Sequence, residues 1–337
     1  MNKQGGFSVR AVVWTVVLVL VLAGLGIFFA VASGDRTARV GIITADQDPY
    51  WQRVVAGAEE AADRFDAELR VARADGTTQT QTELLQEFQE AGLDGIAISP
   101  VDPDRQGLAM RQAAQAADLI TIDSDAELTN RVCFVGMDNY AAGRKCGELI
   151  RRARPEGARI AVVMGPTDKA NGVSRRQGLI DELLDRSYGP GRPMEALGEE
   201  HAGEEYTVAT TLIDSIDPEE AQQNVAEAIQ RDPEINCIVG LFAYSAPAAL
   251  RAIEAAGVSD ITVIGFDDDP ALLDAIAGGR AYATVAQDQY QYGYHAVRLL
   301  AELAEGTANS IPITERVHFP PVVVTQETVE RFRAGRR

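Results

Sequence analysis

Short apolar runs alternate with amphipathic helical segments along the chain from about residue 39 onward. A run such as Ile261–Phe266 lacks strict polar alternation, which is typical of a strand buried on both faces of a parallel sheet. Helical spacing, as in Val54–Phe65, separates one run from the next. The alternation starts again near residue 139, so the sequence predicts two doubly wound α/β domains.

The predicted strands are residues 39–44, 69–71, 94–99, 119–123, 132–136, 159–164, 207–212, 235–241, 261–267 and 282–287, with an extended tail at 317–324. Asp269 and Pro270 predict the start of a helix directly after one of these strands, as N-cap and first helical residue.

An apolar stretch runs from Ala11 to Ala32 and follows the basic residues Lys3 and Arg10. About 20 apolar residues can span a bilayer, which is longer than most secretory leaders, although Ala30–Ala32 resembles a cleavage site. Basic residues before the span predict an internal N-terminus and an exported body. We expect residues 1–34 to be a signal peptide or signal anchor, and the body to be periplasmic or at the cell surface.

The chain has 337 residues, with 31 basic and 50 acidic side chains, and a formal net charge of −19. The length suffices for two domains, and the acidic excess argues against nucleic acid or an anionic membrane surface as a partner.

The cysteines are Cys133, Cys146 and Cys237. In an exported protein one pair can oxidise, and Cys133 with Cys146 is the favoured pair because the two flank one predicted strand-to-helix turn. Three free buried thiols are the alternative. Their spacing does not suit zinc.

Two predicted strands end in a carboxylate, Asp123 and Asp267. Open α/β sheets bind ligands at the carboxyl ends of their strands, and a carboxylate there can accept hydrogen bonds from adjacent hydroxyls. A turn residue that only caps a helix is the alternative interpretation for Asp267.

Six motifs resemble the sugar-binding class of periplasmic binding proteins, the ribose-binding-protein-like group. They are Asp48–Trp51, Ile120–Asp123, Gly136–Asn139, Arg175–Leu179, Val263–Asp267 and Thr284–Gln287. Their order and spacing carry the resemblance, which covers residues 39 to about 324. Sugar-responsive repressors share this body, but the apolar span stands where their DNA-binding domain would be.

The resemblance implies two lobes that close over a ligand, joined by crossings near residues 138–139, 287–288 and 318–320. One lobe would comprise 38–138 plus 288–318, and the other 139–287 plus 319–330. It also implies a monomer that delivers a monosaccharide-type sugar to the permease of an ABC transporter, without catalytic residues, cofactor or metal.

The resemblance also implies a ligand set: Asp48, Tyr50, Trp51, Asp123, Arg175, Phe242, Asp267 and Gln287. Aromatic faces suit the C–H groups of a sugar ring, while carboxylates and an amide suit its hydroxyls. Core packing is the alternative role for Tyr50 and Trp51.

Several positions depart from the family pattern. Ser124 and Val173 stand where ribose binders have arginine, Phe242 stands in place of an asparagine, and Ile216 in place of an aromatic residue. These differences predict a more apolar or differently oriented ligand than ribose, with Phe242 stacking on it.

Three other functions compete with this interpretation. An enzyme lacks motif support, although Asp123 and Asp267 would be the acid/base pair of a glycosidase-like alternative. Asp267–Asp269 do not alternate as calcium ligands do in an EF-hand loop. A membrane-tethered sugar sensor that feeds a signalling partner remains open, favoured by the apolar span.

Overall fold

The computed structural model describes residues 37–335, apart from 49, 168, 188, 190–192, 309–310 and 313. The expected signal peptide or anchor, and with it the hydrophobic N-terminal helix, therefore lies outside the described residues. Within the described part, no helix is both long and apolar enough to cross a bilayer.

The first sheet is parallel throughout, and its central strands are completely buried. Its strand order is β12 (Arg316–Phe319), β5 (Cys133–Met137), β4 (Asp118–Ile122), β3 (Gly95–Ile98), β1 (Arg39–Thr44) and β2 (Glu68–Arg73). The helices that accompany it are α2 (Tyr50–Arg64), α3 (Thr78–Glu90), α4 (Pro103–Ala116) and α10 (Gln289–Ala304), with a short 3-10 helix η1 (Glu127–Thr129).

The second sheet has parallel central strands and an antiparallel strand at each edge. Its order is β13 (Val322–Thr325), β11 (Ala283–Ala286), β10 (Thr262–Phe266), β9 (Cys237–Gly240), β6 (Ala158–Met164), β8 (Tyr206–Ile213) and β7 (His201–Ala202). Its helices are α5 (Asn139–Ala153), α6 (Ala170–Leu183), α7 (Pro218–Arg231), α8 (Ser245–Ala256), α9 (Pro270–Ala277) and α11 (Val329–Gly335).

The two parallel-sheet layers confirm the predicted α/β class, and each predicted strand matches an observed one to within two residues at either end. The antiparallel edges are the difference. β7 is a two-residue strand in a tight hairpin with β8, too short to give a periodic pattern.

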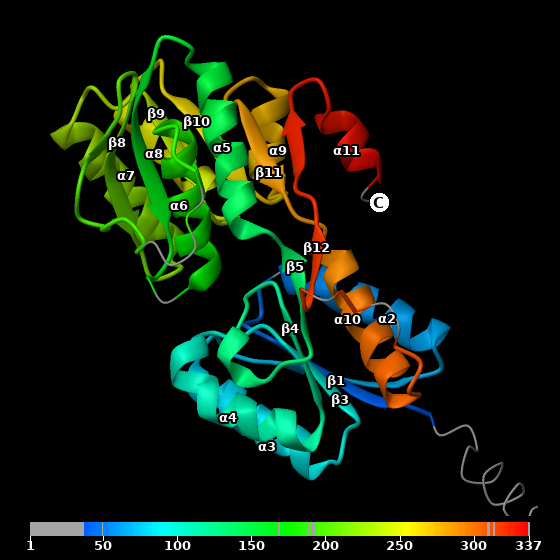
Figure 1. Ribbon diagram of the computed structural model, residues 1–337. Coiled ribbons are helices and arrows are strands. Elements are labelled where there is room, and N and C mark those ends of the chain that lie inside the picture. The colour runs from blue at the N-terminus through cyan, green and yellow to red at the C-terminus, as the bar shows by residue number, and fades with distance from the viewer. Residues whose placement is uncertain are drawn as a thin grey trace, which may run out of the picture. The chain divides into compact units, whose positions relative to one another are not determined.

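Chain segments pass between the two sheets at three places: from β5 into α5, from β11 into α10, and from β12 into β13 (Figure 1). Asp138 is the N-cap of α5, and its side chain accepts a hydrogen bond from the backbone N–H of Ala141.

Helices α2 and α10 lie side by side (Figure 1) and touch through their backbones. A Cβ atom on Gly57 would lie 2.0 Å from the carbonyl oxygen of Tyr290, and one on Gly293 would lie 1.8 Å from that of Val54. Only glycine allows so close an approach at either position.

A second pair of helices, α5 and α6, repeats this arrangement against the second sheet. A Cβ atom on Gly143 would lie 1.8 Å from the carbonyl oxygen of Arg175, and one on Gly178 would lie 2.0 Å from that of Tyr140. The α5–α6 glycines therefore fix where α6 holds its side chains.

Of the two alternatives for the cysteines, the structure has the three free buried thiols and not the disulfide between Cys133 and Cys146. Cys133 begins β5 in the first sheet, whereas Cys146 lies on α5, where Cys237 of the second sheet is its neighbour. The turn between them carries the chain from one sheet to the other, so closeness in sequence does not become closeness in space. Burial raises the pKa of the Cys133 and Cys237 thiols to about 12.

Candidate functional site: a cleft at the carboxyl ends of both sheets

Asp123 and Asp267 occupy matching places in the two sheets. Each follows the last residue of its strand and adopts the left-handed backbone conformation, with φ of 60° and 63°. The backbone N–H of Asp123 donates to the carbonyl of Val135 at 3.1 Å, and that of Asp267 donates to the carbonyl of Val285 at 3.0 Å. The sharp turn at each strand end leaves the carboxylate on the wall of the same cavity.

This cavity has a volume of about 90 Å³ and is lined by every residue of the predicted ligand set. One sheet and its helices contribute Asp48, Tyr50, Trp51 and Asp123; the other contributes Arg175, Phe242, Asp267 and Gln287. That these residues bind a ligand stays a prediction; the structure brings them together.

The Asp123 carboxylate is 9% exposed and accepts two side-chain hydrogen bonds. The Tyr50 hydroxyl donates to its Oδ1 at 2.8 Å, and Asn171 Nδ2 of α6 donates to its Oδ2 at 3.4 Å. Burial raises the pKa of Asp123, and the nearby Arg175 guanidinium opposes that rise. Burial also raises the pKa of Tyr50 well above its usual value, so this hydroxyl remains a donor.

Two linked side chains that follow β11 hold the Asp267 carboxylate. Gln287 Nε2 donates to Asp267 Oδ1 at 2.8 Å, and the Tyr292 hydroxyl donates to Gln287 Oε1 at 3.2 Å. Burial raises the pKa of Asp267 to about 7, against the opposing influence of Arg175 and of the Gln287 hydrogen bond. Additional donors from a ligand would stabilise its ionised form.

Arg175 is fixed on most sides and is 1% exposed. Its Nη1 donates to the carbonyl of Leu241 at 2.8 Å and its Nε to Asn139 Oδ1 at 2.9 Å. The guanidinium carbon lies 4.3 Å from the centre of the Phe266 ring and 5.6 Å from that of Phe242. Its Nη2 is buried with no hydrogen-bond partner among the described residues, so it needs an acceptor that a ligand can supply.

Aromatic rings enter the cavity from both sheets. Tyr50 and Trp51 meet edge to face with ring centres 5.0 Å apart, and Phe242 stacks on Tyr244 at 6.1 Å. Trp51 is only 4% exposed. It therefore belongs to the core and to the cavity at once, and the two interpretations made for it are compatible.

The acidic residues near the strand ends have different roles. Asp48 lines the cavity, and its Oδ1 accepts a hydrogen bond from the N–H of Tyr50 at 2.8 Å, at the start of α2. Asp269 caps α9, as predicted, by accepting from the N–H of Ala271 at 2.8 Å. The described residues contain no group of three or more side chains arranged to hold a metal ion.

Sequence reasoning missed five polar residues of the lining: Asp46, Ser99, Lys169, Asn171 and Tyr244. Lys169 and Asn171 belong to the polar loop and first turn that follow β6. The position of that loop, at the carboxyl end of a strand, was the available signal.

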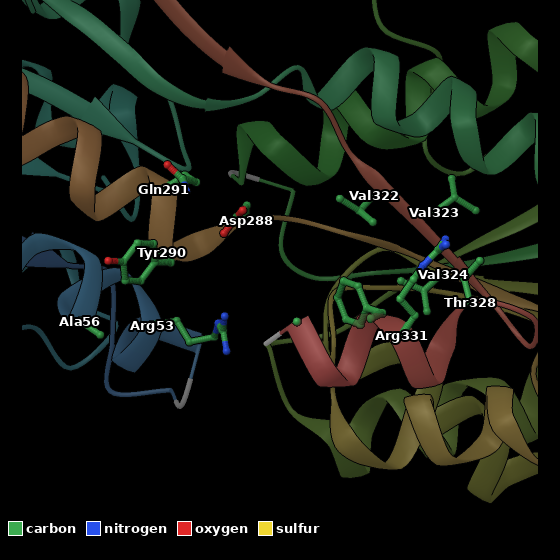
Figure 2. A pocket seen from close by; sticks show the side chains of 12 residues that line it. Arg53, Ala56, Asp288, Tyr290, Gln291, Val322, Val323, Val324, Thr328 and Arg331 are labelled. Carbon is green, nitrogen blue, oxygen red and sulfur yellow. The ribbon is translucent and has the colours of Figure 1, made fainter. Parts of the chain in front are cut away.

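A larger groove of about 680 Å³ contains none of the predicted ligand residues. Figure 2 shows Arg53 and Tyr290 on one side of it and Val322, Val323 and Arg331 on the other. The groove lacks the two strand-end carboxylates, Asp123 and Asp267, that line the smaller cavity. The smaller cavity is therefore the better candidate for a ligand site.

Known proteins are similar to this chain over most of its length. The chain is 25% identical over 266 residues to the ribose import binding protein of Escherichia coli (strain K12), covering 79% of this chain and 84% of that protein. It is 24% identical over 294 residues to the D-allose-binding periplasmic protein of the same organism, covering 83% and 89%.

Among solved structures, the fold is similar to that of a glucose-galactose binding protein from Geobacillus stearothermophilus. The TM-score is 0.77 at 22% identity, over 87% of this chain and 99% of that one. The family model described as periplasmic binding protein domain matches residues 40–308, and the chain therefore belongs to that family.

Proposed function

We propose that the protein is an extracytoplasmic solute-binding protein that captures a monosaccharide-type sugar in the cleft between its sheets. The proposal rests on one observation: two buried carboxylates, Asp123 and Asp267, line the same cavity as Arg175. The Nη2 atom of Arg175 has no hydrogen-bond partner among the described residues. A sugar hydroxyl can accept from a guanidinium and donate to a carboxylate at the same time. The ligands for which the relatives are named, ribose and allose, support the same class.

Each part of the ligand would have its own partner. Hydroxyls would bind Asp267, Asp123 and Arg175, where charge-assisted hydrogen bonds are the strong ones. The C–H faces of the ring would lie against Trp51 and Phe242, whose rings border the cavity. Gln287 and Tyr50 would hold the two carboxylates in place.

Capture would involve movement of two lobes, 38–138 plus 288–318 and 139–287 plus 319–330, about the three crossing segments. Closure of two lobes around a ligand by hinge motion is the established behaviour of periplasmic binding proteins. The hydrogen bond from Asn171 to Asp123 joins residues of the two lobes, which supports a ligand site that is completed on closure.

The captured sugar would pass to the permease of an ABC transporter, and the binding protein would act as a monomer without cofactor or catalysis. Residues 11–32 would export the body and, if uncleaved, anchor it to the inner membrane. Mass spectrometry of the exported N-terminus distinguishes cleavage from anchorage.

Calorimetry with a panel of monosaccharides, amino acids and nucleosides tests the proposal. We expect binding of at least one sugar, and a thermal shift, because a ligand at a hundredfold its Kd adds about 2.7 kcal/mol to the free energy of unfolding. Binding of an amino acid or a nucleoside with no response to any sugar would refute it.

A further inference from the structure

Ile216 has an unusual backbone for its residue type. Its φ is +62°, in the left-handed region that β-branched residues rarely adopt. The side chain is 39% exposed and lines the candidate cleft. Strain of this kind persists where the surroundings impose it, and it points to a use for the side chain.

Buried Asp214 imposes this conformation and also fixes a neighbouring ring. Its Oδ1 accepts from the N–H of Ile216 at 2.9 Å and from the hydroxyl of Tyr244. The single polar atom of the Tyr244 side chain is therefore turned back toward the protein. Asp214 is 3% exposed, so this anchor is part of the interior.

The anchored side chains converge on one place. A Cβ atom on Gly165 would lie 3.1 Å from Tyr244 Oη, 3.3 Å from Phe242 Cε2 and 3.6 Å from Ile216 Cγ1. Phe242 also stacks on Tyr244 with an angle of 18° between the rings. We use the term apolar wall for Ile216, Phe242, Ala243 and Tyr244, which all line the cleft.

The cleft is thus polar in one part and apolar in another. Hydroxyls of a ligand find partners in Asp123, Arg175 and Asp267. A hydroxyl against the apolar wall would lose its hydrogen bonds to water, and the one polar side-chain atom of the wall, Tyr244 Oη, already donates to Asp214. A methyl group there would instead be removed from water favourably.

We propose that the cleft selects a 6-deoxyhexose, with the methyl group of the sugar against the apolar wall. This inference rests on the proposed sugar-binding function. It makes Ile216 a specificity-determining residue, with Asp214 as the residue that positions it.

Calorimetry with matched pairs of sugars tests the inference, since the members of a pair differ only in the C6 hydroxyl. The pairs are L-fucose with L-galactose, L-rhamnose with L-mannose, D-fucose with D-galactose, and 6-deoxy-D-glucose with D-glucose. We expect the 6-deoxy sugar of the pair that binds best to be at least tenfold tighter, the ratio expected for about 1.4 kcal/mol. If the hexose is equal or tighter in every pair that binds, the inference fails while sugar binding stands. If no sugar of any kind binds, the proposed function itself fails.

The variant Ile216→Asn tests whether the apolar wall causes the preference for the 6-deoxy sugar. Asparagine tolerates the left-handed conformation, so the variant should fold, and its amide offers the C6 hydroxyl a partner. We expect the preference for the 6-deoxy sugar to fall at least fivefold. Val258→Asn is the matched control, because Val258 is 37% exposed and lies outside the cleft, and it should leave the preference unchanged. Equal preference in both variants would overturn the role of the wall.

Discussion

Asp123 and Asp267 follow strands of different sheets, yet the guanidinium of Arg175 acts electrostatically on both carboxyl groups. Burial raises the pKa of each carboxyl, and in each case Arg175 is the strongest opposing influence. Because both buried carboxylates share this guanidinium, they keep hydrogen-bonding capacity that a ligand with several hydroxyls can use.

Replacing Asp267 with alanine should weaken sugar binding by about 2–4 kcal/mol, because it removes a charged acceptor from a desolvated site. Calorimetry on the purified variant measures the loss. Asp269→Ala is the matched control: it removes the cap of α9, which costs about 1 kcal/mol of stability, and should keep affinity. If Asp267→Ala unfolds the ligand-free protein but binds sugar normally where folded, Asp267 is a structural turn residue.

Sugar affinity should rise with pH up to about 7 and then level off. The pKa of Asp267 is about 7 in the ligand-free protein, and sugar hydroxyls that donate to the carboxylate favour its ionised form. Binding therefore releases a proton below that pH, and the association constant increases by at most tenfold per pH unit. Titrations between pH 5 and 9 measure the profile, which should flatten in Asp267→Asn. A wild-type profile that falls toward pH 7 would contradict this assignment.

Trp51→Phe should cost about 1 kcal/mol of affinity, because the smaller ring keeps part of the stacking contact. Trp51 is 4% exposed even without ligand, so the variant should also lose some stability, through the gap left in the core. Calorimetry and urea unfolding separate the two effects. An affinity loss above about 3 kcal/mol would instead indicate that the indole N–H binds the ligand.

Thiol titration of the unfolded, non-reduced protein should find three free thiols, since Cys133, Cys146 and Cys237 are all unpaired and buried. The native protein should react slowly, because burial raises the pKa of the thiols and the thiolate is the reactive form. Finding one free thiol would restore the disulfide.

Gly57→Ala should lower the free energy of unfolding by about 1–3 kcal/mol, the usual cost of overpacking. The added Cβ would lie 2.0 Å from the backbone oxygen of Tyr290. Gly107→Ala, inside α4, is the control. The nearest atom there is the end of a flexible arginine side chain at 3.3 Å, so alanine should stabilise the helix by about 0.5–1 kcal/mol. Equal effects in urea unfolding would show that α2 and α10 can move apart at little cost.

The strand ends were predictable because a buried parallel strand leaves a continuous apolar run, and the residue after it marks the ligand edge. This local rule located Asp123 and Asp267. The family resemblance supplied Arg175, Phe242 and Gln287, and the structure places them on the same cavity.

Contacts between distant segments were not predictable in this way. The link between Asp214 and Tyr244 joins residues 30 positions apart, and no periodic pattern marks it. The left-handed turn at Ile216 contradicts the preference of its residue type, so only the surrounding hydrogen bonds reveal it. The choice between a Cys133–Cys146 disulfide and free thiols stayed open for a related reason: sequence distance does not show that a turn changes sheets.

The close contact of Gly143 with the backbone of Arg175 makes the α5–α6 crossing a remote adjustment point for the cleft. Asn171 and Arg175 both lie on α6 and both line the cavity. A methyl group added at Gly143 of α5 would therefore displace the two side chains together. Affinity could then be retuned, in evolution or by design, through a residue that never touches the sugar.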